Sequence, residues 1–351
     1  MVLVSELLEP QPEPLWTIVR QAGVKHVIVL LEGAEQQTRS RLGATGKALE
    51  EQPVPPRGER PWDTKALATL QRRVADHGFT LVGVEDTAPM DKVRLGLPGR
   101  DEQIGWVIDQ IRAMGELGIG VLCYNWMAVS SWARTRSDVA LRGGALATGF
   151  DNDVNQKAAP LAEAGAITEE QLWGGLEYFL RAVVPVAESA GVRLGLHPDD
   201  PPLPVIRGVP RIMGSIDAYR RLVGLVPSKS NGITLCQGNF TLMTDDLPAV
   251  IREFGHADKI AFVHFRDVRG TAESFIETFH DEGKTDMAEC MRAYHEVGFG
   301  GPMRPDHVPT LAGEANDLPG YGTLGRLFAV GYIAGLREAI YGIKTTFEEG
   351  P

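Results

Sequence analysis

The chain has 351 residues, a hydrophobic content of 43% and a formal net charge of −11 at pH 7, with 40 glycines and 23 prolines. This composition is typical of a folded globular protein with a large core and excludes a disordered chain. The acidic excess and the lack of any run of Lys or Arg argue against a nucleic-acid-binding surface, because phosphate contacts need concentrated positive charge.

The start of the sequence and the three cysteines predict the cellular location. The first residues, MVLVSELLEP, contain no basic segment followed by an apolar one, and no stretch of about 18 consecutive apolar residues occurs. Cys123, Cys236 and Cys290 are odd in number and far apart, which does not match a disulfide framework. We therefore expect a cytoplasmic protein without a membrane segment, in which each thiol is buried unless it has a specific role.

Eight short apolar or β-branched runs predict β-strands. In chain order they are VLVS from Val2, HVIVLL from His26, TLVGVE from Thr80, GIGVLCYN from Gly118, VRLGLH from Val192, GITLC from Gly232, IAFVHF from Ile260 and PMRPDH from Pro302. Segments with helical spacing lie between them. The clearest is expected to begin after Thr168, which forms a capping-box pattern with Gln171, and to end at Gly191. Two others are expected over residues 100–118 and roughly 324–340.

This alternation predicts the fold class. Strand, helix and strand in turn imply parallel strands joined by right-handed crossovers, and about eight such units imply a closed (β/α)8 TIM barrel. No repeat or change of composition marks a second domain, so we expect a single TIM-barrel domain over residues 1–351. The Pro-rich stretch from Glu50 to Trp62 is interpreted as a loop of the barrel rather than a linker.

Four metal-binding residue types stand at the ends of four consecutive predicted strands: His197, Cys236, His264 and Asp306. Strand carboxyl ends meet at one face of a TIM barrel, where active sites are built. Imidazole, thiolate and carboxylate together suit a divalent transition metal better than Mg²⁺ or Ca²⁺. Taken alone, each residue could equally be a core or loop residue; together they predict a metal site.

Side chains two residues apart on a strand share a face, so Arg266 is expected beside His264 and Arg304 beside Asp306. Two arginines at a metal site suggest an anionic substrate, most simply a carboxylate. In the alternative interpretation, either arginine pairs with Asp199, Asp200 or Asp267 of the protein itself.

Proton-transfer groups and a substrate-binding surface are predicted next to these ligands. His307 directly follows Asp306, and an imidazole there could move protons near neutral pH or only support the site. Tyr321, in the loop LPGYGTLGR, is a candidate for a second proton donor. Asn125, Trp126 and Arg134 follow the fourth strand, where they could contact a polyhydroxylated ligand or belong to a lid that only packs on the barrel.

The sequence resembles a divergent member of the mannonate dehydratases, which belong to the xylose-isomerase-like TIM barrels. The motifs that carry the resemblance are GLPGRDEQI, LCYNWM, LGLHPDDPP, LCQGNF, VHFRDV, MRPDHV and PGYGTLGR, in the order of the family and from about Gly96 onward. The resemblance implies a hydro-lyase that converts D-mannonate to 2-keto-3-deoxy-D-gluconate. It implies that His197, Cys236, His264 and Asp306 bind Mn²⁺ or Fe²⁺ and that His307 and Tyr321 form the acid/base pair.

Some segments depart from the family pattern. Ser131 replaces an Asp, Ala128 replaces a Pro, and the segment from Glu277 to Met287 lacks part of the family motif. The strand ends in LLEGAEQQ and VEDTAPMD lack the expected histidines. A metal-dependent isomerase, epimerase or lyase acting on another sugar is therefore the second hypothesis. DNA cleavage and an inactive sugar-binding protein are further alternatives, and a homo-oligomer is expected.

Overall fold

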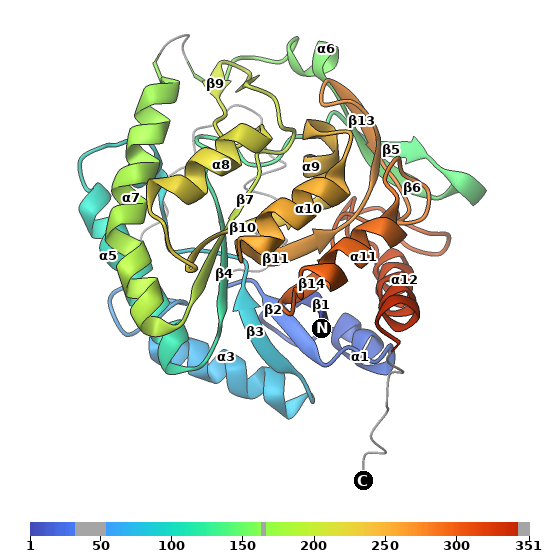
Figure 1. The fold of residues 1–351 in the computed structure, drawn as a ribbon, viewed down its shortest axis with the longest axis horizontal. Helices are drawn as coiled ribbons and strands as arrows, with labels where there is room; N and C mark the ends of the chain where they lie inside the picture. Colours follow the sequence, from blue (N-terminus) through green and yellow to red (C-terminus); the bar gives the residue numbers. More distant parts are fainter. Residues whose placement is uncertain (32–53, 163–165, 343–351) are drawn as a thin grey trace.

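The computed structural model describes residues 1–31, 54–162 and 166–342, and its centre is a closed barrel of eight parallel strands (Figure 1). The barrel strands are β1 (Leu3–Leu8), β2 (His26–Val29), β3 (Thr80–Val84), β4 (Val121–Asn125), β7 (Arg193–His197), β10 (Asn231–Cys236), β11 (Ile260–Phe265) and β14 (Pro302–Pro305). Each pairs with the next along the chain, and β1 pairs with β14 to close the barrel. The predicted fold class and all eight predicted strands are confirmed.

Helices surround the barrel (Figure 1). They are α1 (Pro14–Gln21), α3 (Thr64–Asp76), α4 (Asp91–Arg94), α5 (Arg100–Glu116), α6 (Asn152–Asn155), α7 (Glu169–Ala190), α8 (Ile216–Leu225), α9 (Gln237–Met243), α10 (Leu247–His256), α11 (Met287–Glu296) and α12 (Thr323–Tyr341). The predicted ends of α7 are confirmed: the Thr168 hydroxyl accepts a hydrogen bond from the Gln171 amide, and Gly191 ends the helix with φ of 69°.

Two layers of core residues hold the barrel together. The interior is filled by Leu7, Ile28, Leu30, Val121, Cys123 and Phe262, and the opposite faces of the strands pack against the helices. Because side chains alternate along a strand, the position of Cys123 places Asn125 on the inner face, and the position of Phe262 does the same for His264. This alternation aims the strand-end residues at the barrel axis.

A four-stranded antiparallel sheet outside the barrel was not predicted. Its order is β12 (Val268–Gly270), β13 (Ser274–Glu277), β6 (Leu146–Asp151) and β5 (Arg136–Ala140), and it lies at the upper right of Figure 1. A short hairpin of β8 (Val205–Ile206) and β9 (Val209–Pro210) is also present. The sheet joins two segments more than 100 residues apart, and its short strands carry no clear alternation, so the sequence pattern did not reveal it.

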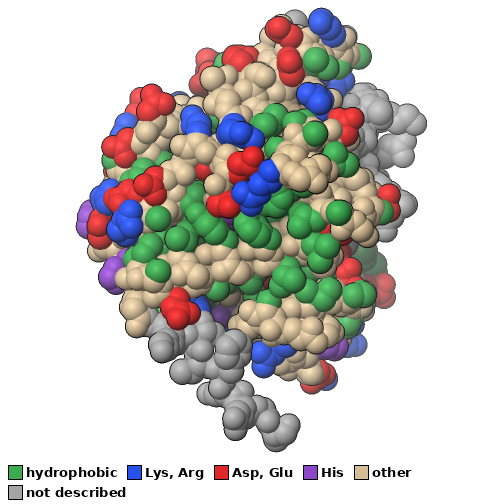
Figure 2. All heavy atoms as spheres, turned by 90° about the vertical axis from the view of Figure 1, so that its right-hand side faces the viewer, with side chains coloured by type: hydrophobic (Ala, Val, Ile, Leu, Met, Phe, Trp, Pro, Cys, Tyr) green, Lys and Arg blue, Asp and Glu red, His purple; other side chains and the backbone are tan. Residues whose placement is uncertain are grey.

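The side of the molecule that includes α12 carries an apolar area. Figure 2 shows the side that includes α12, where hydrophobic side chains gather between charged ones. Leu311, Leu324, Leu327, Phe328 and Tyr332 line an open hollow of about 530 Å³ there. Among the described residues, no helix is both long and apolar enough to cross a membrane. The predicted loop over residues 50–62 lies partly outside the described ranges, and from Val54 to Trp62 it forms turns.

Candidate metal centre and active site

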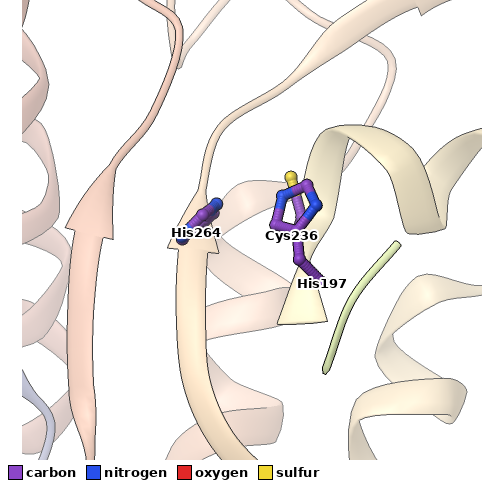
Figure 3. Close-up of side chains that lie close together, drawn as sticks. All are labelled: His197, Cys236 and His264. Atoms are coloured by element: carbon purple, nitrogen blue, oxygen red, sulfur yellow. The ribbon is translucent and has the colours of Figure 1, made fainter. Parts of the chain in front are cut away.

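Three of the four predicted metal ligands come together at the carboxyl end of the barrel (Figure 3). His197 ends β7, Cys236 ends β10 and His264 lies near the end of β11. One ligand atom from each lies within 4.8 Å of the other two, and the two imidazole ring centroids are 5.0 Å apart. Neighbouring parallel strands that end at the same level of the barrel therefore bring two imidazoles and a thiol close together.

Asp306, the fourth predicted ligand, directly follows β14 and borders this group. Its Oδ2 atom lies 3.6 Å from His264 Nδ1 and 3.9 Å from Cys236 Sγ. Burial alone would raise the pKa of Asp306, but the neighbouring His307 and Arg304 hold it well below its usual range. Asp306 therefore offers a carboxylate beside the thiol and the imidazoles.

The free lone pairs of these residues suit a divalent transition metal. His197 Nδ1 lies 2.8 Å from the Pro198 carbonyl oxygen, which can only accept a hydrogen bond, so Nδ1 carries the proton and Nε2 is left to bind. His264 is buried, with Nε2 3.2 Å from Glu85 Oε1 and Nδ1 3.6 Å from Asp306 Oδ2, and neither contact has the geometry of a hydrogen bond. A buried imidazole between two carboxylates and beside a thiol fits a metal ligand.

The surroundings of Cys236 favour the thiolate form of its side chain. Burial would raise its pKa, but the guanidinium of Arg266 beside it, together with His197 and His264, lowers the pKa to about 5. Arg266 Nε lies 3.2 Å from the sulfur. At neutral pH this cysteine is therefore deprotonated, which is the form that binds metals.

A second group of possible ligands, Glu85, Cys123 and His264, does not suit a metal as well. Both Glu85 oxygens accept hydrogen bonds from Arg304, at 2.6 and 2.7 Å. Burial raises the pKa of Cys123, whose sulfur contacts the Thr234 hydroxyl inside the barrel. In this group the Glu85 carboxylate already bonds Arg304, and the Cys123 thiol stays protonated. The group at the strand ends that contains Cys236 is therefore the better candidate for a metal site.

The arginines lie where the strand alternation predicted, but both bond carboxylates of the protein itself, and their binding of a substrate carboxylate stays a prediction. Arg266 bonds Glu277, Asp200 and Asn239, and Arg304 bonds Glu85 and Asp306. Both side chains are at most 2% exposed. The alternative interpretation, pairing within the protein, is thus found for Arg266 and Asp200, since a buried guanidinium needs carboxylate partners.

Arg134 is also held by the protein. Its Nη1 atom donates to Asp200 Oδ1 at 2.6 Å, and its Nη2 atom contacts Asp200, Glu277 and His307. The prediction that it binds substrate directly is therefore not supported. Asp199 pairs instead with Arg211, and its Oδ2 accepts a hydrogen bond from the Met213 amide.

His307 and Tyr321 lie together beside Asp306. Their rings meet edge to face with centroids 5.5 Å apart, and His307 Nε2 is 3.9 Å from Asp306 Oδ1. Burial raises the pKa of Tyr321, so its phenol stays protonated at neutral pH. The two predicted proton-transfer groups are thus next to each other and to a predicted ligand.

The remaining predicted site residues differ in position. Asn125 ends β4 opposite His197, and its side-chain oxygen accepts a hydrogen bond from the Met127 amide. Trp126 points away from the cluster: it donates to the Leu172 carbonyl of α7 and packs on Phe179. Trp126 is therefore packed in the core, because the residue after Asn125 faces the helices, and its position gives no support to the expectation that it contacts substrate.

Two acidic residues of the site were not singled out from the sequence. Glu85 directly follows β3 and lies 3.2 Å from His264 Nε2; its position at a strand end could have revealed it. Glu277 ends β13 in the sheet outside the barrel, and it contacts His307 at 3.0 Å. No sequence signal indicated Glu277, because its strand is not part of the barrel.

Comparison with known proteins assigns this chain to a family. The family model of D-mannonate dehydratase (UxuA) matches residues 14–164 and 156–346, including the N-terminal third, where the motifs gave little resemblance. Mannonate dehydratase 2 of Halalkalibacterium halodurans is 34% identical over 305 residues, which cover 80% of this chain and 88% of that protein.

Solved structures agree with this relationship. The crystal structure of mannonate dehydratase from Streptococcus suis serotype 2 superposes with a TM-score of 0.85 at 28% identity, covering 100% of this chain and 99% of that one. A D-psicose 3-epimerase from Clostridium cellulolyticum, at 13% identity and a TM-score of 0.57 with 97% and 99% covered, shares the barrel fold alone. The chain belongs to the D-mannonate dehydratase (UxuA) family.

Proposed function

We propose that this protein is a metal-dependent hydro-lyase that converts D-mannonate to 2-keto-3-deoxy-D-gluconate. The observation that carries the proposal is the convergence of His197, Cys236 and His264 at the strand ends, bordered by Asp306 and His307, in a chain of this family. The reaction needs a base, an acid and a Lewis acid, and each has a candidate here.

The metal-binding set consists of His197, Cys236, His264 and Asp306. The free Nε2 of His197, the buried ring of His264 beside Asp306 and the thiolate of Cys236 support this assignment. Thiolate and imidazole together favour a borderline ion, and we propose Mn²⁺ or Fe²⁺. When bound, the ion stabilises the negative charge that builds on the substrate carboxylate as the C2 proton leaves.

His307 takes the C2 proton and Tyr321 donates a proton to the departing C3 hydroxyl. Support comes from their adjacency, with ring centroids 5.5 Å apart, and from the protonated state of the buried phenol. The C2–H and C3–O bonds break, a C2–C3 double bond forms and water leaves; the resulting enol becomes the 2-keto product. The proton on His307 then returns to Tyr321 by way of solvent.

The buried arginines act through the protein's own groups. Arg266 keeps Cys236 and Asp306 charged, and Arg304 holds Glu85 and Asp306. Asn125, at the height of His197, is the candidate for bonding a substrate hydroxyl. The two arginines are given these roles because each buried guanidinium already bonds carboxylates of the protein.

The direct test is to load the protein with Mn²⁺, add D-mannonate and measure 2-keto-3-deoxygluconate. We expect product in amounts well above those of a His307→Asn variant with the same metal content. A panel of other aldonates, uronates and keto-sugars runs in parallel. Turnover of a panel member without turnover of D-mannonate would replace the proposal with isomerase, epimerase or lyase action on that sugar.

A further inference from the structure

The sheet outside the barrel brings one carboxylate into the active site. Glu277 is the last residue of β13, which pairs with β12 and β6 rather than with any barrel strand. Its side chain is nevertheless only 1% exposed and lies 3.0 Å from Nδ1 of His307. A buried carboxylate in contact with the proposed base calls for a physical explanation.

The hydrogen atoms around this contact determine where the proton of His307 lies. Arg134 Nη2 carries two hydrogens, and its two carboxylate neighbours, Asp200 and Glu277, accept both. Nη2 also lies 3.0 Å from His307 Nδ1, but charged carboxylates are stronger acceptors for its two hydrogens than a neutral imidazole. A carboxylate oxygen can only accept, so the 3.0 Å contact with Glu277 favours a hydrogen on Nδ1.

The opposite edge of the ring is then free for chemistry. With the proton on Nδ1, a neutral imidazole keeps its lone pair on Nε2. Nε2 lies 3.9 Å from Asp306 Oδ1, on the side of the predicted metal ligands. In this ring orientation, Nδ1 faces Glu277 and Nε2 faces the predicted metal ligands.

The backbone and the neighbouring rings hold His307 in this orientation. Its φ of 34° lies in the left-handed region, which non-glycine residues rarely adopt. The next residue, Val308, donates its amide hydrogen to the Gly320 carbonyl at 2.7 Å, and the Trp132 ring lies 5.0 Å from the imidazole. An unfavourable backbone angle kept in place by its surroundings is a common feature of functional residues.

We propose that Glu277 is the positioning residue of His307: it keeps the resting proton on Nδ1 and stabilises the imidazolium that forms when Nε2 takes the substrate proton. The inference rests on the proposed role of His307 as the base. The bond from C2 to hydrogen breaks, the Nε2–H bond forms, and the electron pair moves into the C2–C3 bond as the C3 hydroxyl leaves with the Tyr321 proton. Glu277 remains a carboxylate throughout.

The tautomer can be measured without any substrate. The protein is labelled with ¹⁵N-histidine and loaded with zinc, which, unlike manganese, does not broaden nuclear resonances. His307 is assigned by its loss in the His307→Asn variant. We expect Nδ1 to be protonated and Nε2 to be unprotonated in the wild type. An Nε2–H tautomer in the wild type would overturn the proposal, whether or not the protein dehydrates D-mannonate.

Glu277→Gln then tests the role in turnover. We expect kcat to fall by about 10²–10⁴-fold with KM changed less than about threefold, because imidazolium stabilisation matters after binding. In the same ¹⁵N spectra we expect the Nδ1–H tautomer to be less populated, because a neutral amide is a weaker acceptor than a carboxylate. An unchanged tautomer together with an unchanged kcat would contradict the role of Glu277.

Asp200→Asn is the matched control. Asp200 is a second buried carboxylate on the same two guanidinium groups, Arg134 and Arg266, but it makes no hydrogen bond to His307 in the described structure. We expect a comparable loss of thermal stability with the tautomer of His307 unchanged. A change of tautomer as large as that of Glu277→Gln would assign the effect to the arginines rather than to Glu277.

Discussion

Burial controls the chemistry of individual side chains in the site. Tyr321 keeps its proton because burial raises its pKa, and its ring meets that of His307 edge to face. Tyr321→Phe removes only the hydroxyl, so we expect kcat to fall by about 10²–10⁴-fold with little change in KM. Steady-state kinetics at saturating metal measures this. Tyr178→Phe, on the exposed face of α7, should keep full activity; equal losses in both variants would rule out a specific role for Tyr321.

His280 predicts how stability depends on pH. It is fully buried, and burial lowers its pKa to about 4 from an ordinary value of 6.5. The unfolded chain therefore binds a proton more readily than the folded one. Stability from the neutral ring is complete above pH 6.5 and is lost as the pH falls towards 4, by up to about 3 kcal/mol.

The variant His280→Phe fills the same space between Phe265 and Tyr332 without a titrating group. We expect urea unfolding of the metal-free protein to show less loss of stability between pH 6.5 and 4.5 in this variant than in the wild type. His256→Gln, an exposed histidine of α10, is the control and should follow the wild type. If stability falls with pH as steeply in His280→Phe as in the wild type, another group is responsible for the loss.

At the scale of elements, the close approach of α5 and α7 depends on a missing side chain. A Cβ atom on Gly115 would lie 2.7 Å from the Cβ atom and carbonyl oxygen of Ala190. Gly115→Ala should therefore destabilise the protein by about 1–3 kcal/mol through overpacking. Gly105 lies on the same helix with nothing within 4 Å, so Gly105→Ala should stabilise by roughly 0.5–1 kcal/mol.

Chemical denaturation of the two glycine variants measures both effects. Because the residue change is identical and the helix is the same, helix propensity cancels in the comparison and only the contact with α7 differs. Equal stability changes in the two variants would mean that the helices can separate at no cost, contrary to the tight packing seen here.

The external sheet shows how elements from distant parts of the chain build one site. Strands β5 and β6 follow β4, whereas β12 and β13 follow β11. Their pairing brings Glu277 next to His307, which itself follows β14. The barrel thus provides the proposed metal ligands, and an added sheet supplies the neighbour of the proposed base.

At the scale of the whole molecule, metal binding should stabilise the fold. A ligand that binds only the native state at about a thousand times its Kd adds about 4 kcal/mol, so removing the metal with EDTA should lower Tm by roughly 5–10 °C. Scanning calorimetry with and without Mn²⁺ measures this. Cys236→Ser should reduce the difference, whereas Cys290→Ser, a buried thiol of α11 outside the cluster, should keep it. An equal difference in all three proteins would exclude Cys236 as a ligand.

Self-association remains a prediction. The apolar hollow along α12 leaves Leu324 and Leu327 about 40% exposed, which is unusual for large aliphatic side chains. We expect sedimentation velocity to give a dimer or larger species, and Leu327→Glu to weaken it more than Leu97→Glu does. Leu97 is exposed to a similar degree outside the hollow. A monomeric wild type at micromolar concentration would end this prediction.

Sequence patterns alone determined the barrel and the identity of the clustered residues. Strand runs and helical spacing depend on neighbours in the chain, so the eight strands, the cap at Thr168 and the strand-end positions of His197, Cys236 and His264 could be predicted. The even alternation of side chains also placed Arg266 and Arg304 beside the ligands.

Only the tertiary structure decided which charged side chains already bond other residues of the protein. A sequence cannot show that Asp200, Glu277 and Glu85 bond the three guanidinium groups, because these partners lie up to about 220 residues away along the chain. The direction of Trp126 and the contact of Glu277 with His307 depend in the same way on long-range packing. Local patterns specify elements, whereas pairing of buried charges is settled by the three-dimensional arrangement, since each charge must find a partner away from water.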